Sequence, residues 1–137
     1  MSECVLEAKI DNIYKLSNFL EGELSKLDVS TAEDMKMNLV MEELFVNIAN
    51  YAYAPKYGNC TICAEVFPEQ NAIEITLTDT GIPFNPLKRK DPDVTLSARE
   101  RKVGGLGIFM AKQEVDDISY RRENGQNILW LRKEFGK

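Results

Sequence analysis

The stretch from Met41 to Tyr53 constrains the fold of this chain more than any other part of the sequence. Within and just before it, apolar residues recur at helical spacing, namely Met37, Val40, Met41, Leu44, Ile48 and Tyr51. At roughly 100° per residue they fall on one broad arc, which predicts a long helix with this arc in the core. Glu43, Asn47 and Asn50 stack at i, i+4 and i+7 and form a narrow polar stripe on the same helix.

The polar stripe leaves two interpretations open. Val40 and Tyr51 border it on one side of the helical wheel, and Leu39 and Val46 border it on the other. A carboxylate and two amides between apolar neighbours need partners, because buried polar groups without hydrogen bonds are costly. The stripe therefore binds a ligand or hydrogen-bonds the next element of the fold.

The composition excludes several classes of function. A chain of 137 residues, 44% hydrophobic and 28% charged, is expected to form one domain over residues 1–137. Its net charge of −5 provides no basic field for a phosphate backbone, so nucleic acid is not an expected partner. No apolar run approaches the roughly 20 residues of a membrane span, and the N-terminus lacks the features of a signal peptide. We therefore expect a cytoplasmic protein without a membrane partner.

The chain contains no histidine, which excludes Ser-His-Asp and Cys-His nucleophiles and histidine metal ligands. Acid–base chemistry must therefore use carboxylates. The three cysteines, an odd number without a secretory signal, favour free thiols. Cys60 and Cys63 stand three positions apart in an expected strand and should point to opposite faces, so we interpret them as packing residues.

The remaining periodicity predicts helices and antiparallel strands. The predicted helices are Ile13–Leu27 with Asp11 or Asn12 as N-cap, a long helix from Ser30 or Thr31 that Pro55 and Gly58 end, and a third ending near Glu114. The predicted strands are Cys4–Ile10, Thr61–Phe67, Ala72–Asp79, Asp117–Arg122 and Asn127–Lys133. Turns at Pro68–Asn71 and at Asn124-Gly125 join two pairs of strands into hairpins. Because apolar and polar residues alternate over 73–78, one sheet face should be covered by helices, which gives an α+β fold.

Two segments near the strand ends carry residues suited to a ligand. Asp79 ends its strand and is followed at once by turn formers from Thr80 to Pro86. The charged segment from Leu87 to Lys102 has few apolar residues and predicts a long mobile loop. The glycine-rich stretch Val103–Met110 then opens a helix, where free N–H groups and the helix dipole suit a phosphate. A plain junction between a loop and a helix explains the same glycines.

Three motifs occur in chain order: Glu43-x-x-x-Asn47, Asp79-x-Gly81 and Gly104-Gly105-x-Gly107. They resemble the N, G1 and G2 boxes of the ATPase fold shared by gyrase B, Hsp90, histidine kinases and MutL. Within this GHKL superfamily the chain is most similar to the small anti-sigma factor serine/threonine kinases of bacteria, over nearly its whole length and in the segments ELFVNIANYAY, DTGIPFNP and VGGLGIFM. The resemblance implies a Bergerat ATP-binding fold, a two-layer α/β sandwich with a mixed, mostly antiparallel sheet and helices packed on one face.

The resemblance also implies a role for each residue of these motifs. Asn47 would ligate Mg²⁺ through its amide oxygen, and Glu43 would act as the general base for a hydroxyl nucleophile. Asp79 would accept the amino group of adenine, while Gly81 would let the base pack against the backbone. The other residues implied in binding ATP are Asn50, Phe84, Arg101, Lys102, Gly104, Gly105, Leu106 and Gly107.

The chain departs from the family pattern in two places. Its last strand, over 127–131, lacks the threonine that often supports adenine through water, which implies a slightly altered recognition of the base. At the end of the long helix, Tyr51 and Ala52 stand where many relatives carry histidine and glycine. Neither change removes a residue of the three motifs.

The resemblance implies an ATP-dependent anti-sigma regulatory kinase. Such a protein phosphorylates a small STAS-type anti-sigma antagonist on serine or threonine and sequesters a sigma factor, and a homodimer is left open. The alternative is a non-catalytic module in which nucleotide gates the binding of a protein. Glu43 favours phosphoryl transfer, since a switch needs no base. An isolated histidine-kinase catalytic domain fits less well, because the chain has no histidine to receive phosphate.

Overall fold

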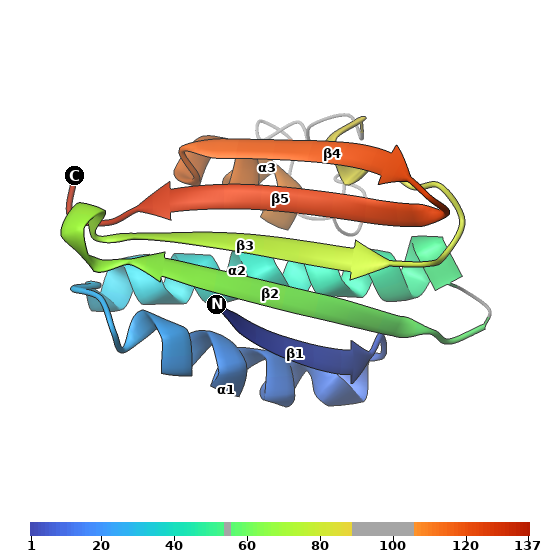
Figure 1. Ribbon diagram of the computed structural model, residues 1–137, viewed down its shortest axis with the longest axis horizontal. Coiled ribbons are helices and arrows are strands. Elements are labelled where there is room, and N and C mark those ends of the chain that lie inside the picture. The colour runs from blue at the N-terminus through green and yellow to red at the C-terminus, as the bar shows by residue number, and fades with distance from the viewer. Residues whose placement is uncertain (54–55, 89–105) are drawn as a thin grey trace, which may run out of the picture.

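A five-stranded antiparallel sheet forms one layer of the protein in the computed structural model, which describes residues 1–53, 56–88 and 106–137 (Figure 1). The strands are β1 (Ser2–Glu7), β2 (Asn59–Phe67), β3 (Ala72–Asp79), β4 (Asp117–Glu123) and β5 (Gln126–Glu134), in the spatial order β1-β2-β3-β5-β4. The helices are α1 (Ile13–Leu24), α2 (Thr31–Asn47) and α3 (Leu106–Glu114). In Figure 1, α2 and α3 pass behind the sheet and α1 lies beside β1. The α+β sandwich with a mostly antiparallel sheet is confirmed, and all four strand pairings of the described residues are antiparallel.

The alternation of β3 determines which side chains face the helices. Ile73, Ile75 and Leu77 are almost fully buried, whereas the residues between them are half-buried. Asp79 has the same parity in the strand, so its carboxylate also points to the helix side and is only 4% exposed. In the ladder Asp79 lies opposite Asn127 of β5, and this amide shares the inner face. The apolar pattern that builds the core thus also delivers two polar side chains into it.

The helix α2 begins with a capping box at Ser30, one of the two starting residues that the sequence predicts. Ser30 Oγ accepts from the Glu33 N–H at 3.1 Å, and Glu33 Oε1 accepts from the Ser30 N–H at 3.1 Å. Its core-facing arc is buried, since Met37, Val40, Met41 and Leu44 are each no more than 1% exposed. Each such side chain contributes about 1.5–3 kcal/mol to folding.

The prediction of a continuous α-helix is wrong for the second half of the long helix. The α-helix ends at Asn47 and the chain continues as a π-helix over Ile48–Tyr53. Because bonds in a π-helix run from i to i+5, each residue advances less around the axis than the prediction assumed. Asn50 is therefore exposed, and Tyr51, expected in the core, is 43% exposed. Leu39, expected to border the polar stripe, is 49% exposed, so one side of the stripe opens to solvent.

The N-terminal elements are shifted and shortened relative to the prediction. The first strand covers Ser2–Glu7 and not Cys4–Ile10, because Ile10–Asn12 form a 3₁₀ turn. Asn12 precedes α1 but makes no side-chain capping bond, and its amide instead donates to the Glu7 carbonyl at 2.8 Å. The helix α1 ends at Leu24, three residues before the predicted end.

Both predicted hairpins are confirmed. Between β2 and β3 a 3₁₀ turn at Pro68–Gln70 is followed by Asn71 in the left-handed conformation, with φ of 49°. Between β4 and β5 the residues Asn124 and Gly125 have φ of 52° and 75°. Two positive φ values are what a type I′ turn requires, and asparagine and glycine tolerate them best.

The cysteines are free thiols, as expected. Cys60 is fully buried on the inner face, and burial raises the pKa of its thiol. Cys63 lies on the opposite face of β2, where its thiol contacts Glu3 Oε2 at 3.6 Å. The two side chains therefore do not form a joint metal or redox site. No helix in the described parts of the chain is long and apolar enough to cross a membrane.

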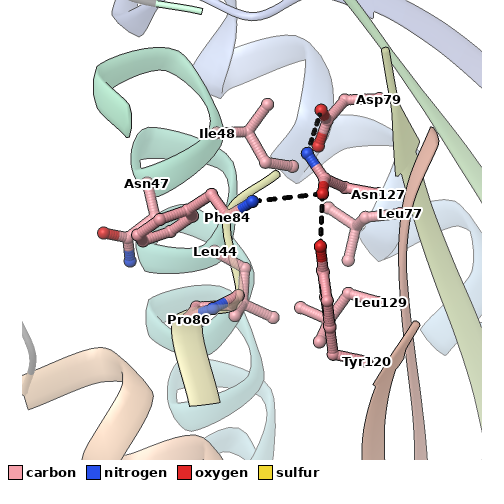
Figure 2. A pocket seen from close by; sticks show the side chains of 10 residues that line it. All are labelled: Leu44, Asn47, Ile48, Leu77, Asp79, Phe84, Pro86, Tyr120, Asn127 and Leu129. Carbon is pink, nitrogen blue, oxygen red and sulfur yellow. Dashed lines mark hydrogen bonds between the residues drawn. The ribbon is translucent and has the colours of Figure 1, made fainter. Parts of the chain in front are cut away.

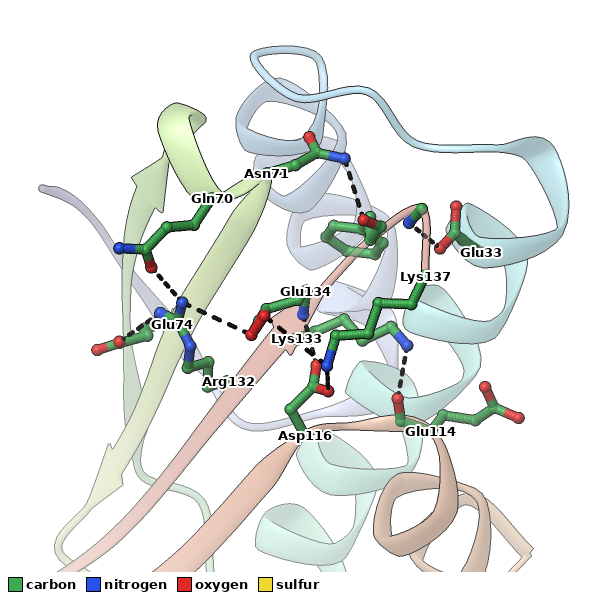
Figure 3. A network of polar contacts seen from close by, with 12 residues as sticks. Glu33, Gln70, Asn71, Glu74, Glu114, Asp116, Arg132, Lys133, Glu134 and Lys137 are labelled. Carbon is green, nitrogen blue, oxygen red and sulfur yellow. Dashed lines mark hydrogen bonds and ion pairs between the residues drawn. The ribbon is translucent and has the colours of Figure 1, made fainter.

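The C-terminal residues join the end of the sheet to two helices (Figure 3). Lys133 Nζ donates to the Glu114 carbonyl at the end of α3, at 2.7 Å. The Gly136 N–H donates to Glu33 Oε2 in the first turn of α2, at 2.9 Å. Asp116, which follows α3, accepts from the Glu134 N–H at 2.6 Å and pairs with Lys137. This C-terminal polar network, made of the residues just named, stabilises the end of the sandwich remote from Asp79.

Candidate functional site

A small cavity lies between α2 and the inner face of the sheet, at the end where β3 terminates (Figure 2). Its lining residues are Leu44, Asn47, Ile48, Leu77, Asp79, Phe84, Pro86, Tyr120, Asn127 and Leu129. The cavity measures about 10 Å³, which is room for about one water molecule. A larger ligand would therefore have to displace the segment that carries Phe84 and Pro86 outward.

The cavity brings together three residues that the sequence selects: Asn47, Asp79 and Phe84. Glu43 lies one turn before Asn47 and is half-buried. Asn50 does not join them, because the π-helix directs it to a separate hollow of about 420 Å³ beside Lys9. That hollow faces the N-terminal elements and not the cavity.

Asp79 is the buried carboxylate of the cavity. Its Oδ1 accepts two hydrogen bonds, from the Gly81 N–H at 2.9 Å and from Asn127 Nδ2 at 2.8 Å. Burial raises the pKa of Asp79, and it outweighs these two hydrogen bonds and the charge of Arg122, which lower the pKa. A buried carboxylate whose pKa is raised in this way is typical of a binding site.

Asn127 connects Asp79 to the segment after β3. Besides donating to Asp79, its Nδ2 donates to the Ile82 carbonyl at 2.8 Å. Its Oδ1 accepts from the Phe84 N–H at 3.2 Å and from the Tyr120 hydroxyl. All four hydrogen-bonding positions of the amide are therefore used, as Figure 2 shows for three of them.

The sequence interpretation did not select Asn127, Tyr120 or Arg122. Arg122 Nη1 donates to the Gly81 carbonyl at 2.8 Å and so stabilises the turn after Asp79. The alternation of each strand could have identified these residues. Tyr120 and Arg122 occupy alternate positions of β4 and so share one face of the sheet, and Asn127 lies on the same face of β5 as Leu129. Recognising this shared face requires the pairing of β5 with β3, which the sequence alone does not supply.

The π-helix and the turn after β3 are tied together by backbone contacts. The Ala52 carbonyl accepts from the Ile82 N–H at 3.0 Å. At Gly81 a Cβ atom would lie 2.4 Å from the Ala52 carbonyl oxygen, so the glycine is needed for this close approach. The sequence assigned Gly81 to packing against a base, and the structure adds this packing against Ala52.

Aromatic residues of the π-helix reinforce the same contact. The rings of Tyr51 and Phe84 stack with their centroids 5.0 Å apart. The Tyr53 hydroxyl accepts from the Thr80 N–H at 2.8 Å and donates to the Asn59 carbonyl at 2.7 Å. Tyr51, which departs from the family pattern, thus supports the segment that carries Phe84.

Asn47 is oriented by its own helix. Its Nδ2 donates to the Glu43 carbonyl at 2.9 Å and approaches Glu43 Oε1 at 3.5 Å, so the amide oxygen is turned away from that carbonyl. The amide oxygen of Asn47 suits Mg²⁺, a cation that prefers oxygen ligands, takes few of them from the protein and keeps phosphate oxygens and waters. The residues present therefore fit this ion. No cluster of three or more His, Cys, Asp or Glu side chains exists among residues 1–53, 56–88 and 106–137.

The remaining candidate residues lie at or beyond the edge of what the structure describes. Leu106 and Gly107 form the first turn of α3, in agreement with a helix opening after the glycines. Arg101, Lys102, Gly104 and Gly105 lie outside the described residues, as does most of the expected loop from Leu87 to Lys102.

Comparison with protein families matches residues 6–133 to the family described as histidine kinase-like ATPase domain. The chain belongs to this family. The match confirms the superfamily that the three motifs indicate, and it spans every helix and strand from α1 to β4.

Curated relatives point to protein kinases within the family. The chain is 24% identical to the serine-protein kinase RsbW of Bacillus cereus over 131 residues, which cover 93% of this chain and 81% of the relative. It is 23% identical to RsbW of Staphylococcus epidermidis, with coverage of 95% and 84%. The serine/threonine-protein kinase BtrW of Bordetella bronchiseptica is 23% identical over 69% of this chain and 66% of its own length.

Solved structures support the fold. The Acinetobacter baumannii histidine kinase AdeS matches all of this chain and 70% of its own chain, with a TM-score of 0.53 and 16% identity. The histidine kinase domain of a blue-light activated histidine kinase from Erythrobacter litoralis has a TM-score of 0.52 at 13% identity. This second match covers 74% of the present chain but only 44% of the Erythrobacter chain.

Proposed function

We propose that this protein binds ATP with Mg²⁺ and transfers the γ-phosphate to a serine or threonine hydroxyl of a partner protein. The observation that carries the proposal is the convergence of Asp79 and Asn47 on one cavity, with Glu43 one turn from Asn47 on α2. These residues come from two motifs that are distant in the sequence. Their types match the three tasks of binding a base, binding a metal ion and removing a proton.

Each residue has a defined task in this reaction. Asp79 accepts a hydrogen bond from the amino group of adenine and so selects the base. Asn47 would bind Mg²⁺ through its amide oxygen, and the ion when bound neutralises charge on the phosphates. Glu43 removes the proton of the attacking hydroxyl, which is the role of a general base in phosphoryl transfer. The proposal also retains Arg101, Lys102 and the glycines at 104, 105 and 107 as phosphate contacts.

The expected partners are proteins. The relatives named serine-protein kinases support a protein as phosphate acceptor. Following the anti-sigma kinases that the sequence resembles, we infer that the acceptor is a small STAS-type antagonist and that a sigma factor is the regulated partner. The alternative is a module in which nucleotide gates protein binding without turnover. Glu43 favours the kinase, because binding alone would not need a carboxylate beside Asn47.

The deciding experiment combines capture with labelling. The protein is used to capture partners from extract of its native cell, and the complex is incubated with labelled ATP and Mg²⁺. We expect label on one captured protein, at serine or threonine. Glu43→Gln retains shape but removes the base and should lower transfer by about 10²–10⁴-fold without abolishing ATP binding.

The matched control is Glu42→Gln, the same chemical change at the neighbouring half-buried position. It should leave transfer within a few-fold of the wild type. If the wild type binds both a partner and Mg-ATP yet labels nothing, the kinase is excluded and the nucleotide-gated module takes its place.

A further inference from the structure

We propose that Asn127 is a positioning residue that holds the carboxylate of Asp79 with one oxygen turned to the ligand, and so sharpens the preference of the site for a 6-amino purine over a 6-oxo purine. The inference rests on the proposed function, because it deepens the assignment of Asp79 to the base. It arises from the hydrogen bonds that converge on Asn127.

The orientation of the Asn127 amide is determined by backbone groups. Its Oδ1 accepts from the Phe84 N–H, a group that can only donate. Its Nδ2 donates to the Ile82 carbonyl, a group that can only accept. A flipped amide would place its NH₂ group against the Phe84 N–H and its oxygen against the Ile82 carbonyl. Asn127 must therefore present Nδ2 to Asp79. The Tyr120 hydroxyl donates to the same Oδ1 and agrees with this orientation.

Asp79 in turn is held with one oxygen occupied. Its Oδ1 accepts from both the Gly81 N–H and Asn127 Nδ2, while Oδ2 receives no hydrogen bond from the described residues. Among the described residues, every fully buried polar side-chain atom has a hydrogen-bond partner. Because Oδ2 has no such partner, it must be accessible to solvent. Oδ2 is therefore the acceptor that remains for a ligand. Adenine can donate to it through its 6-amino group, whereas a 6-oxo purine presents an oxygen there.

This arrangement predicts the outcome of changing Asp79 to its amide. In Asp79→Asn, the donors from Gly81 and Asn127 require an oxygen at the Oδ1 position, which forces the new NH₂ group to the position of Oδ2. The ligand then meets a donor in place of an acceptor. The preference should invert toward a 6-oxo purine, and the inversion depends on Asn127.

The test replaces Asn127 by threonine and by valine, two residues that are isosteric with each other. Asn127→Thr keeps a hydroxyl that can donate to Asp79, whereas Asn127→Val removes the donor at nearly the same shape, and both residues suit a strand. Each full-length variant is titrated calorimetrically with Mg-ATP and with Mg-ITP, which differs in carrying oxygen at position 6. We expect the wild type and Asn127→Thr to prefer ATP. Asn127→Val should lose about tenfold in the ratio of the two affinities, which corresponds to one good polar contact.

The Asp79→Asn substitution is measured alone and together with Asn127→Val. Alone it should prefer ITP, and with Asn127→Val the preference should return toward equality. Thermal unfolding checks that each variant folds. If neither Asn127 variant folds, Asp79→Asn decides by itself, since an unchanged preference would overturn the proposal.

The outcomes distinguish a failure of the role proposed for Asn127 from a failure of the proposed nucleotide site. A wild type that binds neither nucleotide refutes the proposed nucleotide site and the inference with it. A wild type that prefers ATP while Asn127→Thr and Asn127→Val give equal ratios refutes only the inference, and leaves Asn127 with a packing role.

Discussion

At the scale of single residues, Asp79 combines a stability cost with the binding function proposed for it. Burial raises its pKa above the value of 3.8 expected in the unfolded chain. The folded state therefore binds the proton more tightly than the unfolded state, and stability falls as pH rises through the interval from 3.8 to the folded pKa. Under the proposed function, an ionised, buried carboxylate is retained against this cost because the nucleotide needs it.

The sign of this effect can be measured directly. In Asp79→Asn the titrating group is absent, so the free energy of unfolding of the variant minus that of the wild type should increase as pH rises through the same interval. Denaturant unfolding at several pH values gives this difference, in which the contributions of distant carboxylates cancel. A difference that stays constant with pH would show that Asp79 ionises as freely in the folded as in the unfolded state.

Two glycines make a matched pair for a second prediction at this scale. At Gly81 a Cβ would lie 2.4 Å from the Ala52 carbonyl oxygen, whereas at Gly22, exposed on α1, nothing lies within 4 Å. Gly81→Ala should therefore destabilise by about 1–3 kcal/mol, because backbone must shift. Gly22→Ala should stabilise by about 0.5–1 kcal/mol through helix propensity. Urea denaturation of both variants tests the pair, and equal effects would contradict the close contact at Gly81.

At the scale of elements, the sequence predicts what local chemistry determines. The start of α2 at Ser30 or Thr31 and the turn at Asn124-Gly125 are specified by adjacent residues, and both form as predicted. The π-helix over Ile48–Tyr53 could not be predicted, because its apolar spacing also fits an α-helix. The π-helix makes hydrogen bonds to residues distant in the sequence, such as the one that the Ala52 carbonyl accepts from the Ile82 N–H.

The residues of the candidate site also differ in whether local sequence predicts them. Asn47 and Asp79 stand in recognisable local motifs, and the structure brings both to one cavity. Asn127 is separated from Asp79 by 48 positions, and its role follows only from the register that sets β5 beside β3. A strand residue of ordinary type carries no local sign of such a contact. Predicting it would require the strand order as well as the strands.

The C-terminal polar network gives the prediction at this scale. Partial burial raises the pKa of Asp116, but the Lys137 ammonium, the Glu134 N–H and the charge of Lys133 together outweigh it and lower the pKa. The resulting stability is present above the unfolded value of 3.8 and is lost as pH falls through the folded pKa.

Asp116→Asn should therefore destabilise by about 1 kcal/mol at neutral pH, and the difference from wild type should vanish in acid. Asp117→Asn, the same change at the next and exposed position, is the control and should have almost no effect. Chemical denaturation at pH 7 and below pH 3.8 measures both variants. An equal loss for Asp116→Asn at both pH values would assign the effect to shape and not to charge.

At the scale of the whole molecule, the cavity joins elements from distant parts of the chain. Its lining comes from α2, the π-helix, the sheet and the segment 80–88. At about 10 Å³ it is nearly closed, so a purine must move Phe84 or its neighbours outward to reach Asp79. Binding should then fix these elements against one another, and its free energy becomes part of the stability of the entire fold.

This coupling leads to a prediction for the intact protein. A ligand at a hundredfold excess over its Kd adds about 2.7 kcal/mol to the free energy of unfolding, and in a chain of this size the midpoint should rise by about 8–13 °C with Mg-ATP. Chelating the metal ion should reduce the rise in the wild type. In Asn47→Ala, which removes the proposed metal-binding oxygen, the rise should be smaller and the same with and without Mg²⁺. Thermal unfolding followed by circular dichroism measures all four conditions, with Mg-GTP as the control nucleotide. Equal shifts with ATP and GTP would contradict a site whose base selectivity comes from Asp79, and a Mg²⁺ effect that survives Asn47→Ala would place the metal ion elsewhere.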